Sequence, residues 1–196
     1  MNKTVIPSLA AAMACVLSAC SSPKLCTRDI TKSDPHAKAL VTASQDAHGK
    51  KAFSKVRDVS VRYEGKWAAV GPKFQPALAD TKFRRGSEER LLVASRVIAQ
   101  ELSGPGGKKV VVRAPGKASV ACTGVPSTDA DVQRAAALVA DAYTMFLLGP
   151  FYFDRPGVVF ASNGEGMVDH APCDEVLAVL RPGFGMANED RVVLLI

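Results

Sequence analysis

The sequence predicts one α+β domain, in which antiparallel strands form a curved sheet and an N-terminal helix and a mid-chain apolar helix cover it. Three observations predict this class. Helix-start residues and a helical apolar pattern appear at residues 34–56, and a longer apolar helix is expected at residues 128–148. Between and after these segments, apolar and polar residues alternate at period two, interrupted by Gly and Pro turns. We therefore expect the folded domain to occupy residues 34–196.

Residues 1–19 have the composition of a secretory signal. They contain one basic residue, Lys3, followed by an apolar core and a small-residue ending. The core is too short for a membrane span. The last residues before Cys20, Leu-Ser-Ala, resemble the lipobox of bacterial lipoproteins, whereas an ordinary signal with a chance cysteine is the alternative. The resemblance implies that Cys20 is lipidated and becomes the first mature residue, so that residues 20–33 form a flexible tether to the membrane.

The first helix of the domain is expected to begin at Asp34-Pro35, since Asp is a good N-cap and Pro suits the first turn. Ala37, Leu40 and Val41 then share one face. Gly49 interrupts the pattern, which predicts either a kinked helix or two short ones.

The strands of the first half are expected in an antiparallel meander. Residues 71–87 are predicted to be loop with at most one edge strand, and residues 88–94 fit a helix or a strand. The Gly-Pro-Gly-Gly stretch before Lys108 is interpreted as a hairpin turn, since it lacks the Lys-Ser/Thr ending and the following helix of a phosphate-binding loop. The expected strands are residues 59–64, 96–102, 108–113 and 117–123.

The mid-chain helix carries the strongest pattern. Thr128 is expected to cap it, with Asp131 completing a capping box, and Gly149-Pro150 is expected to end it. One broad face is apolar, and aromatic residues are concentrated at its C-terminal end. This face either covers the core of the sheet or forms the wall of a pocket for an acyl chain. On the polar face, we expect Asp141 to form a solvated pair with Arg134.

The C-terminal part is expected to hold four more strands. Residues 157–162 and 166–170 should form a hairpin around Asn163-Gly164, which is a strong turn signal. Residues 174–180 and 190–196 should follow. Because an apolar final strand would leave an exposed edge, our hypothesis is that the chain is truncated and the domain incomplete.

The overall composition fits an exported, folded protein. Its formal charge is +6, and no basic run is interleaved with aromatics as in single-strand binding, so we expect no nucleic-acid partner. A basic envelope protein would instead meet anionic lipid head groups. Among the cysteines other than Cys20, we expect a disulfide between Cys122 and Cys173, since Cys26 lies in the expected tether.

Enzymatic chemistry has little support in the sequence. His170 and Cys173 occupy a polar turn, without two further ligands at metal spacing or a third partner for a nucleophile. The chain also lacks a serine elbow and a dinucleotide fingerprint. We therefore expect no enzyme, no cofactor and no metal.

The order of elements resembles that of the LolA/LolB-like proteins, which sort lipoproteins to the bacterial outer membrane. Short phrases add to the resemblance, including His48-Gly49-Lys50-Lys51-Ala52-Phe53 and Leu180-Arg181-Pro182-Gly183-Phe184-Gly185. The resemblance implies an open half-barrel whose concave, apolar side is covered by helices and takes up acyl chains. It also implies a lipoprotein anchored in the outer membrane and facing the periplasm.

Two functional hypotheses result. The first is a module that binds a lipid, an acyl chain or a lipoprotein in an apolar pocket, and the second is a structural or protein-interaction lipoprotein with a filled core. The residues expected to line the pocket are Trp67, Tyr143, Phe146, Leu147, Phe151 and Phe153.

Overall fold

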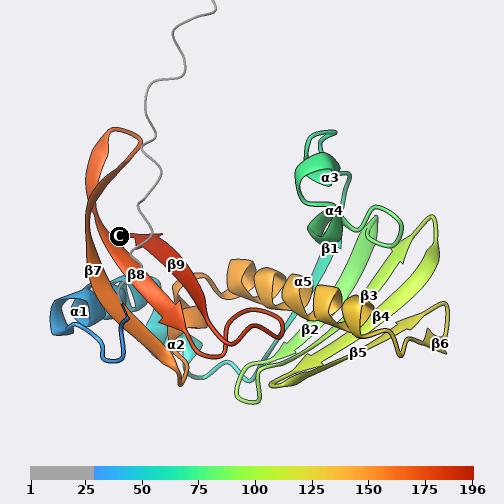
Figure 1. The fold of residues 1–196 in the computed structure, drawn as a ribbon, viewed down its shortest axis with the longest axis horizontal. Coiled ribbons are helices and arrows are strands. Elements are labelled where there is room, and N and C mark those ends of the chain that lie inside the picture. Colours follow the sequence, from blue (N-terminus) through green and yellow to red (C-terminus); the bar gives the residue numbers. More distant parts are fainter. Residues whose placement is uncertain (1–28) are drawn as a thin grey trace, which may run out of the picture.

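The computed structural model describes residues 29–196. The expected signal sequence, the lipidation at Cys20 and most of the expected tether therefore lie outside the described residues. The fold is α+β, as predicted, but the strands form two separate antiparallel sheets instead of one curved sheet (Figure 1). The first sheet has six strands in sequence order and is not closed into a barrel. The second has three strands, β7–β8–β9.

In each sheet, strands that are neighbours in space are also consecutive in the sequence. The strands of the first sheet are β1 (Asp58–Glu64), β2 (Gly86–Leu92), β3 (Val97–Gly104), β4 (Gly107–Ala114), β5 (Lys117–Cys122) and β6 (Val125–Pro126). The strands of the second sheet are β7 (Val158–Val168), β8 (Ala171–Leu180) and β9 (Asp190–Leu195). The helices are α1 (Pro35–Ala47), α2 (Lys50–Phe53), α3 (Gly71–Phe74), α4 (Pro76–Ala79), α5 (Ala130–Leu148) and the 3₁₀ helix η1 (Gly149–Phe153).

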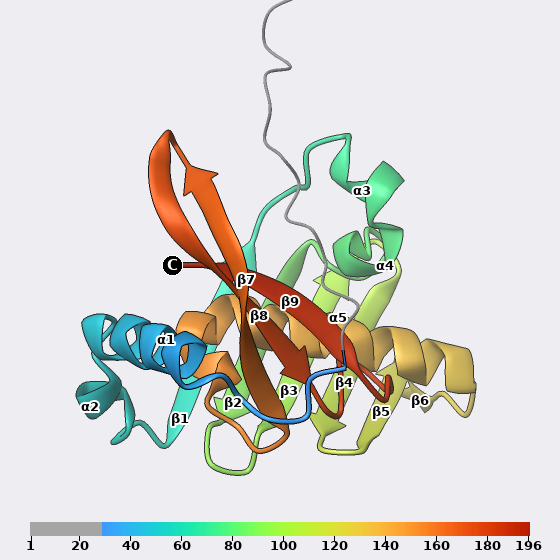
Figure 2. The ribbon, with the colours of Figure 1, turned by 60° about the vertical axis from the view of Figure 1, so that its left-hand side comes forward.

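Helix α5 separates the two sheets in the chain and lies across the face of the first one (Figures 1 and 2). Its N-cap is Asp129, not the predicted Thr128, because the Asp129 carboxylate accepts hydrogen bonds from the backbone N–H of Asp131 and Val132. It ends at Gly149, as predicted. The combined helical segment Ala130–Phe153 is long and apolar enough to cross a membrane by length and composition alone. One face of α5, including Ala136 and Ala140, is buried against the first sheet.

The N-terminal helix is confirmed, but it covers a different sheet from the one expected. Asp34 caps α1 by accepting a hydrogen bond from His36 N–H at 2.8 Å, and Gly49 separates α1 from α2 with a φ of 86°. Helix α1 packs on β7 and η1, so it belongs to the second sheet. The prediction that both helices cover one concave face is therefore wrong.

The meander of the first sheet is confirmed with tighter turns than expected. Gly104 pairs with Gly107 and Ala114 pairs with Lys117, so each hairpin has a two-residue Pro-Gly loop. The stretch predicted to be loop instead contains α3, α4 and the start of β2, while the ambiguous residues 88–94 mostly form a strand. A side chain at Gly104 would place its Cβ 2.7 Å from the Lys82 carbonyl oxygen. Only glycine therefore lets the end of β3 lie this close to the chain between α4 and β2.

The hairpin predicted at Asn163-Gly164 is wrong. Strand β7 runs through this pair with a register shift between Ser162 and Gly164, and the chain reverses later, at Asp169-His170. An Asn-Gly pair supplies a positive φ for a bulge as readily as for a turn, and Gly164 has a φ of 114°. Asn163 Nδ2 also donates a hydrogen bond to Glu175 Oε2 on β8 at 2.8 Å, which fixes the bulge to the neighbouring strand.

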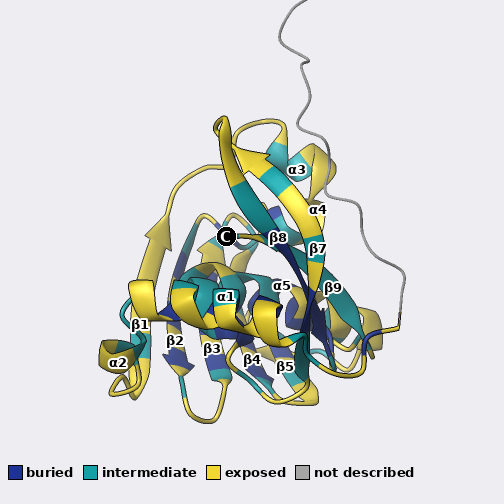
Figure 3. Cartoon of the chain, turned by 90° about the vertical axis from the view of Figure 1, so that its left-hand side faces the viewer, coloured by how far each residue is buried: buried dark blue, intermediate teal, exposed yellow. Residues whose placement is uncertain are grey.

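Three apolar clusters form the core, and Figure 3 shows them as the buried parts of both sheets. One lies between α5 and the first sheet, where Leu91, Ile98 and Val111 contact Ala136 and Ala140. The other two cover the two faces of the second sheet. Residues 176–180 of β8 are buried on both faces, since α1 and η1 cover one of them and the segment at Ile30 covers the other.

A buried ion pair joins the first sheet to α5 and to the loop between β8 and β9. Arg113 on β4 donates to the Asp141 carboxylate on α5, with NH2 to Oδ2 at 3.0 Å, and also to the Gly185 carbonyl oxygen at 2.6 Å. Gly185 N–H in turn donates to Asp141 Oδ2 at 2.6 Å. The predicted partner of Asp141, Arg134, instead pairs with Asp131 on the helix surface. Asp141 therefore holds elements together and is not a solvated surface group.

Candidate functional site

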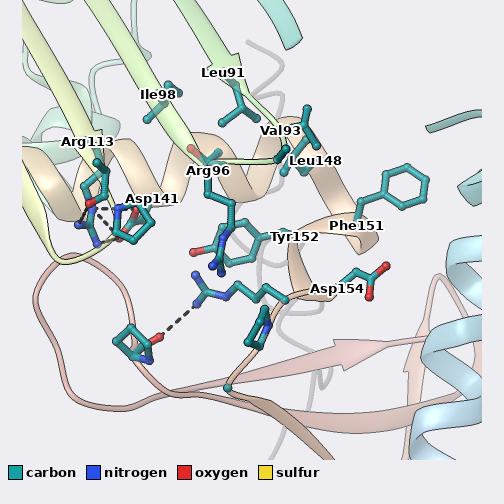
Figure 4. Close-up of a pocket in the computed structure, with 18 of the residues that line it drawn as sticks. Leu91, Val93, Arg96, Ile98, Arg113, Asp141, Leu148, Phe151, Tyr152 and Asp154 are labelled. Atoms are coloured by element: carbon teal, nitrogen blue, oxygen red, sulfur yellow. Dashed lines mark hydrogen bonds and ion pairs between the residues drawn. The ribbon is translucent and has the colours of Figure 1, made fainter. Parts of the chain in front are cut away.

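A cavity of about 580 Å³ lies where α5 ends, between the first sheet and the start of the second one. We call it the inter-sheet cavity; Figure 4 shows it in close-up. This volume is within the range of about 300–1,000 Å³ that is usual for small-molecule sites. Its walls come from the β2–β3 turn, the β4–β5 turn, the α5–η1 junction and the chain around the start of β7 and the end of β8.

The apolar part of the lining comes from both sides of the cavity. Leu91 and Ile98 contribute from the first sheet, while Leu148 and Phe151 contribute from the α5–η1 junction (Figure 4). Phe53 of α2 stacks on Phe151, with ring centroids 4.3 Å apart and nearly parallel planes. The half-buried side chains of Phe53, Leu148 and Phe151 therefore offer apolar surface on which a hydrocarbon chain would be shielded from water, while Leu91 and Ile98 lie buried beneath the wall.

Five cationic side chains also line this cavity, and three of them have carboxylate partners. The three ion pairs are Lys50–Asp154 at 2.8 Å, Arg113–Asp141 at 3.0 Å and Arg181–Glu189 at 2.6 Å. Within residues 29–196, neither Arg96 nor Arg155 forms an ion pair. The described lining therefore carries two positive charges that are not neutralised by a carboxylate.

Arg155 packs on the ring of Tyr152, and Arg96 points toward the same residue from the opposite wall of the cavity (Figure 4). The guanidinium carbon of Arg155 lies 4.6 Å from the centroid of the Tyr152 ring, and its NH2 donates to the Pro182 carbonyl oxygen at 3.2 Å. Arg96 lies in the β2–β3 turn with a φ of 53°, and its side chain extends toward Tyr152 in Figure 4. Because a guanidinium has five N–H donors, the contact with Pro182 leaves most of those of Arg155 available.

Tyr152 is the most unusual group of the lining. Its side chain packs between Phe153 and Phe184 and is only 6% exposed. Its hydroxyl has no hydrogen-bond partner among the residues that the structure describes. Burial raises the pKa of Tyr152 to about 12, and the nearby Arg155 opposes this increase only in part. At neutral pH the hydroxyl is therefore protonated, and it is a buried donor that a ligand oxygen could satisfy.

The six residues predicted to form an apolar pocket do not share one cavity. Phe151 lines the inter-sheet cavity. Phe153 is buried in the core of the second sheet, and Leu147 packs against the core of the first. Tyr143 and Phe146 form an edge-to-face pair elsewhere on α5, and Phe146 is exposed. Trp67 is also exposed, in the segment before α3. The prediction was wrong in joining them because it rested on helical periodicity and on nearness in sequence.

Tyr143 belongs to a second polar cluster beneath α5. The guanidinium carbon of Arg84 lies 3.8 Å from the Tyr143 ring centroid, and Arg84 NH1 bonds to Glu89 Oε1 at 2.7 Å. Gln100 Nε2 donates to Glu89 Oε2 at 2.8 Å. Within the described chain, Arg84 Nε and NH2 and Gln100 Oε1 have no hydrogen-bond partner. This polar group interrupts an otherwise apolar sheet face, but none of these residues lines the inter-sheet cavity.

The expected disulfide does not form. Cys122 on β5 and Cys173 on β8 are both free thiols, and they belong to different sheets. The prediction rested only on elimination, since Cys26 lies in the expected tether, and not on any indication that the two strands are close. Over residues 29–196 we also find no group of three or more His, Cys, Asp and Glu side chains that could hold a metal ion.

Three polar residues of the inter-sheet cavity, Arg96, Arg155 and Tyr152, were not predicted from the sequence. Arg96 follows a strand, Arg155 follows a helix, and such positions are ordinary places for a solvated charge. One signal was present, since Tyr152 stands between two phenylalanines directly after an apolar helix. Its burial follows only from the packing of η1 against the second sheet.

Comparisons with known proteins add no identification. No family model, no curated protein and no solved structure matches this chain.

Proposed function

We propose that the protein is a lipid-anchored protein of the bacterial envelope that binds an acyl chain, from a lipid or a lipoprotein, in the inter-sheet cavity. The observation that carries the proposal is the cavity itself, with its apolar walls on both sides and two arginines without carboxylate partners. The resemblance to LolA/LolB-like proteins supports the same class of function, although the site lies between two sheets and not inside a half-barrel. Anchoring through Cys20 in the outer membrane, on the periplasmic side, completes the proposal.

The expected driving force is burial of hydrocarbon. Each methylene removed from water contributes about 0.8 kcal/mol. Phe53, Leu148 and Phe151 are half-buried and offer apolar surface at one end of the cavity, whereas Leu91 and Ile98, at 1% and 2% exposed, offer almost none. An acyl chain bound here would lie against the first group. We therefore expect affinity to increase with chain length until the cavity is filled.

Native mass spectrometry of the whole chain, extracted from membranes in a mild detergent, tests the proposal. We expect additional masses of lipid size that disappear after organic extraction. Ala94 offers a matched variant, since it is exposed and lines the cavity, so Ala94→Trp should fill the space without disturbing the core. Ala99→Trp is the control, because Ala99 is also exposed but lies on the face of β3 that points away from α5 and does not line the cavity. Loss of the lipid masses in the first variant alone is the expected result.

The alternative is a protein-interaction lipoprotein that binds no small ligand. The exposed apolar residues before and in α3 favour it, since Trp67, Val70 and Phe74 are 44%, 57% and 78% exposed. Exposed apolar residues that lie close together are typical of protein-interaction surfaces. If the wild-type chain is folded and carries no lipid before extraction, the acyl-binding proposal is wrong and the interaction role is favoured.

A further inference from the structure

We infer that the inter-sheet cavity selects an anionic amphiphile, in which a carboxylate or phosphate head group is held by Arg96, Arg155 and the Tyr152 hydroxyl. This inference rests on the proposed function and names the class of its ligand. The shared chemistry is an anionic oxygen group attached to a single hydrocarbon chain.

The balance of charge is the first argument. Both acidic side chains that line the cavity are already engaged, Asp141 by Arg113 and Asp154 by Lys50. Arg181 is held by Glu189 and by the backbone carbonyl of Ile30. Arg96 and Arg155 therefore remain as cations whose charge no described carboxylate balances. Arg155 is half-buried beside apolar side chains, so an anion would interact with it more strongly than in water, whereas Arg96 is exposed and would add a solvated charge.

The buried hydroxyl of Tyr152, which lies beside Arg155, is the second argument. A buried polar group without a hydrogen bond costs free energy, so most such groups in folded proteins have a partner. Here the orphan donor belongs to the residue on which Arg155 stacks, and the same residue lines the cavity. An anionic oxygen placed near this ring would accept from the hydroxyl and from a guanidinium together.

The backbone at Arg96 is a third observation. A φ of 53° is left-handed, a conformation that Gly or Asn adopts at lower cost than Arg. The turn that holds Arg96 is closed by its own N–H bonding to the Val93 carbonyl oxygen at 3.3 Å. The arginine therefore occupies a strained position that brings its side chain toward Tyr152, as Figure 4 shows.

These contacts also orient the ligand. The head group would lie at Tyr152, between the β2–β3 turn and the chain that follows η1. The hydrocarbon chain would then extend toward Val93, Leu148 and Phe151, which line the same cavity and are half-buried (Figure 4). An uncharged amphiphile such as an alcohol would reach the same wall and could accept one hydrogen bond, but it would leave the charge of both guanidinium groups unbalanced.

The test is a calorimetric titration of the full chain in phosphatidylcholine nanodiscs, which accommodate any lipid anchor, with empty nanodiscs as the blank. The probes are octyl phosphate, octanoate, octanol and inorganic phosphate. We expect both charged octyl probes to bind at least tenfold more tightly than octanol, and inorganic phosphate to bind most weakly. Arg96→Gln and Arg155→Gln should each remove about tenfold of the affinity for octyl phosphate and leave that for octanol unchanged. Tyr152→Phe should lower octyl phosphate affinity in the same selective way.

Arg62→Gln is the control, since Arg62 is an exposed arginine of β1 that does not line the cavity. It should leave every affinity unchanged. Equal binding of octanol and octyl phosphate to the wild type would overturn the inference and leave the acyl-binding proposal intact. Equal binding of inorganic phosphate and octyl phosphate would show an anion site that does not use a hydrocarbon chain, which also overturns it. If no octyl probe binds, the proposed function itself fails.

Discussion

Removal of the Asp141 carboxylate should destabilise the protein strongly, because Asp141 joins three elements. Its oxygens accept from Arg113 Nε and NH2 and from the Gly185 N–H, at 2.6–3.3 Å. In Asp141→Asn, the amide keeps one acceptor oxygen, while its NH₂ group faces groups that are themselves donors. Arg113, only 8% exposed, would then keep a buried charge without its counterion. Breaking a buried pair in this way costs about 3–5 kcal/mol.

Urea unfolding, followed by circular dichroism, measures this loss as a decrease in the free energy of unfolding. Asp131→Asn is the matched control, since Asp131 is also an α5 aspartate paired with an arginine, but its side chain is 82% exposed. An exposed pair contributes about 1 kcal/mol or less. If the two variants lose the same small amount of stability, Asp141 does not join the sheets energetically and our reasoning is refuted.

Three further predictions concern Tyr152, two glycines and the two described cysteines. Because the pKa of Tyr152 is about 12 when folded and about 10 when unfolded, the free energy of unfolding should fall as the pH rises from 10 through 12, by up to about 3 kcal/mol. Tyr152→Phe should remove this decrease. If the free energy of unfolding falls equally with pH in the wild type and the variant, the prediction is wrong. Gly157→Ala should lower the free energy of unfolding by more than about 2 kcal/mol. The added Cβ would lie 1.8 Å from the Arg181 carbonyl oxygen, so the backbone would have to move. Gly116→Ala, also at positive φ but with open space around it, should cost only about 1–2 kcal/mol in the same unfolding assay. Finally, alkylation of the denatured protein without reductant should label Cys122 and Cys173 alike, and a peptide pair linked by a disulfide would show that the two thiols are not free.

Much of the local structure could be predicted because it depends on neighbouring residues. The Asp34 cap, the break at Gly49 and the end of α5 at Gly149 follow from side chains and backbone freedom within one helical turn. Strands β1, β3, β4 and β5 followed from alternation, since one face of a half-buried strand meets the core and the other water, whereas β2 fitted a helix or a strand by sequence. The Asn163-Gly164 prediction failed because the same pair suits a bulge and a turn, and only the partner strand distinguishes them.

By itself, the sequence determined the α+β class, both long helices and most strand positions, because period and capping act over a few residues. Only the tertiary structure decided how those elements combine. Arg113 meets residues 28 and 72 positions away, and Tyr152 becomes a buried donor only where η1 packs on the second sheet. The sequence contains these side chains without indicating their partners, since charge pairing and burial depend on distances that the folded chain sets. That is why the pocket expected along one helix face is instead a cavity between two sheets.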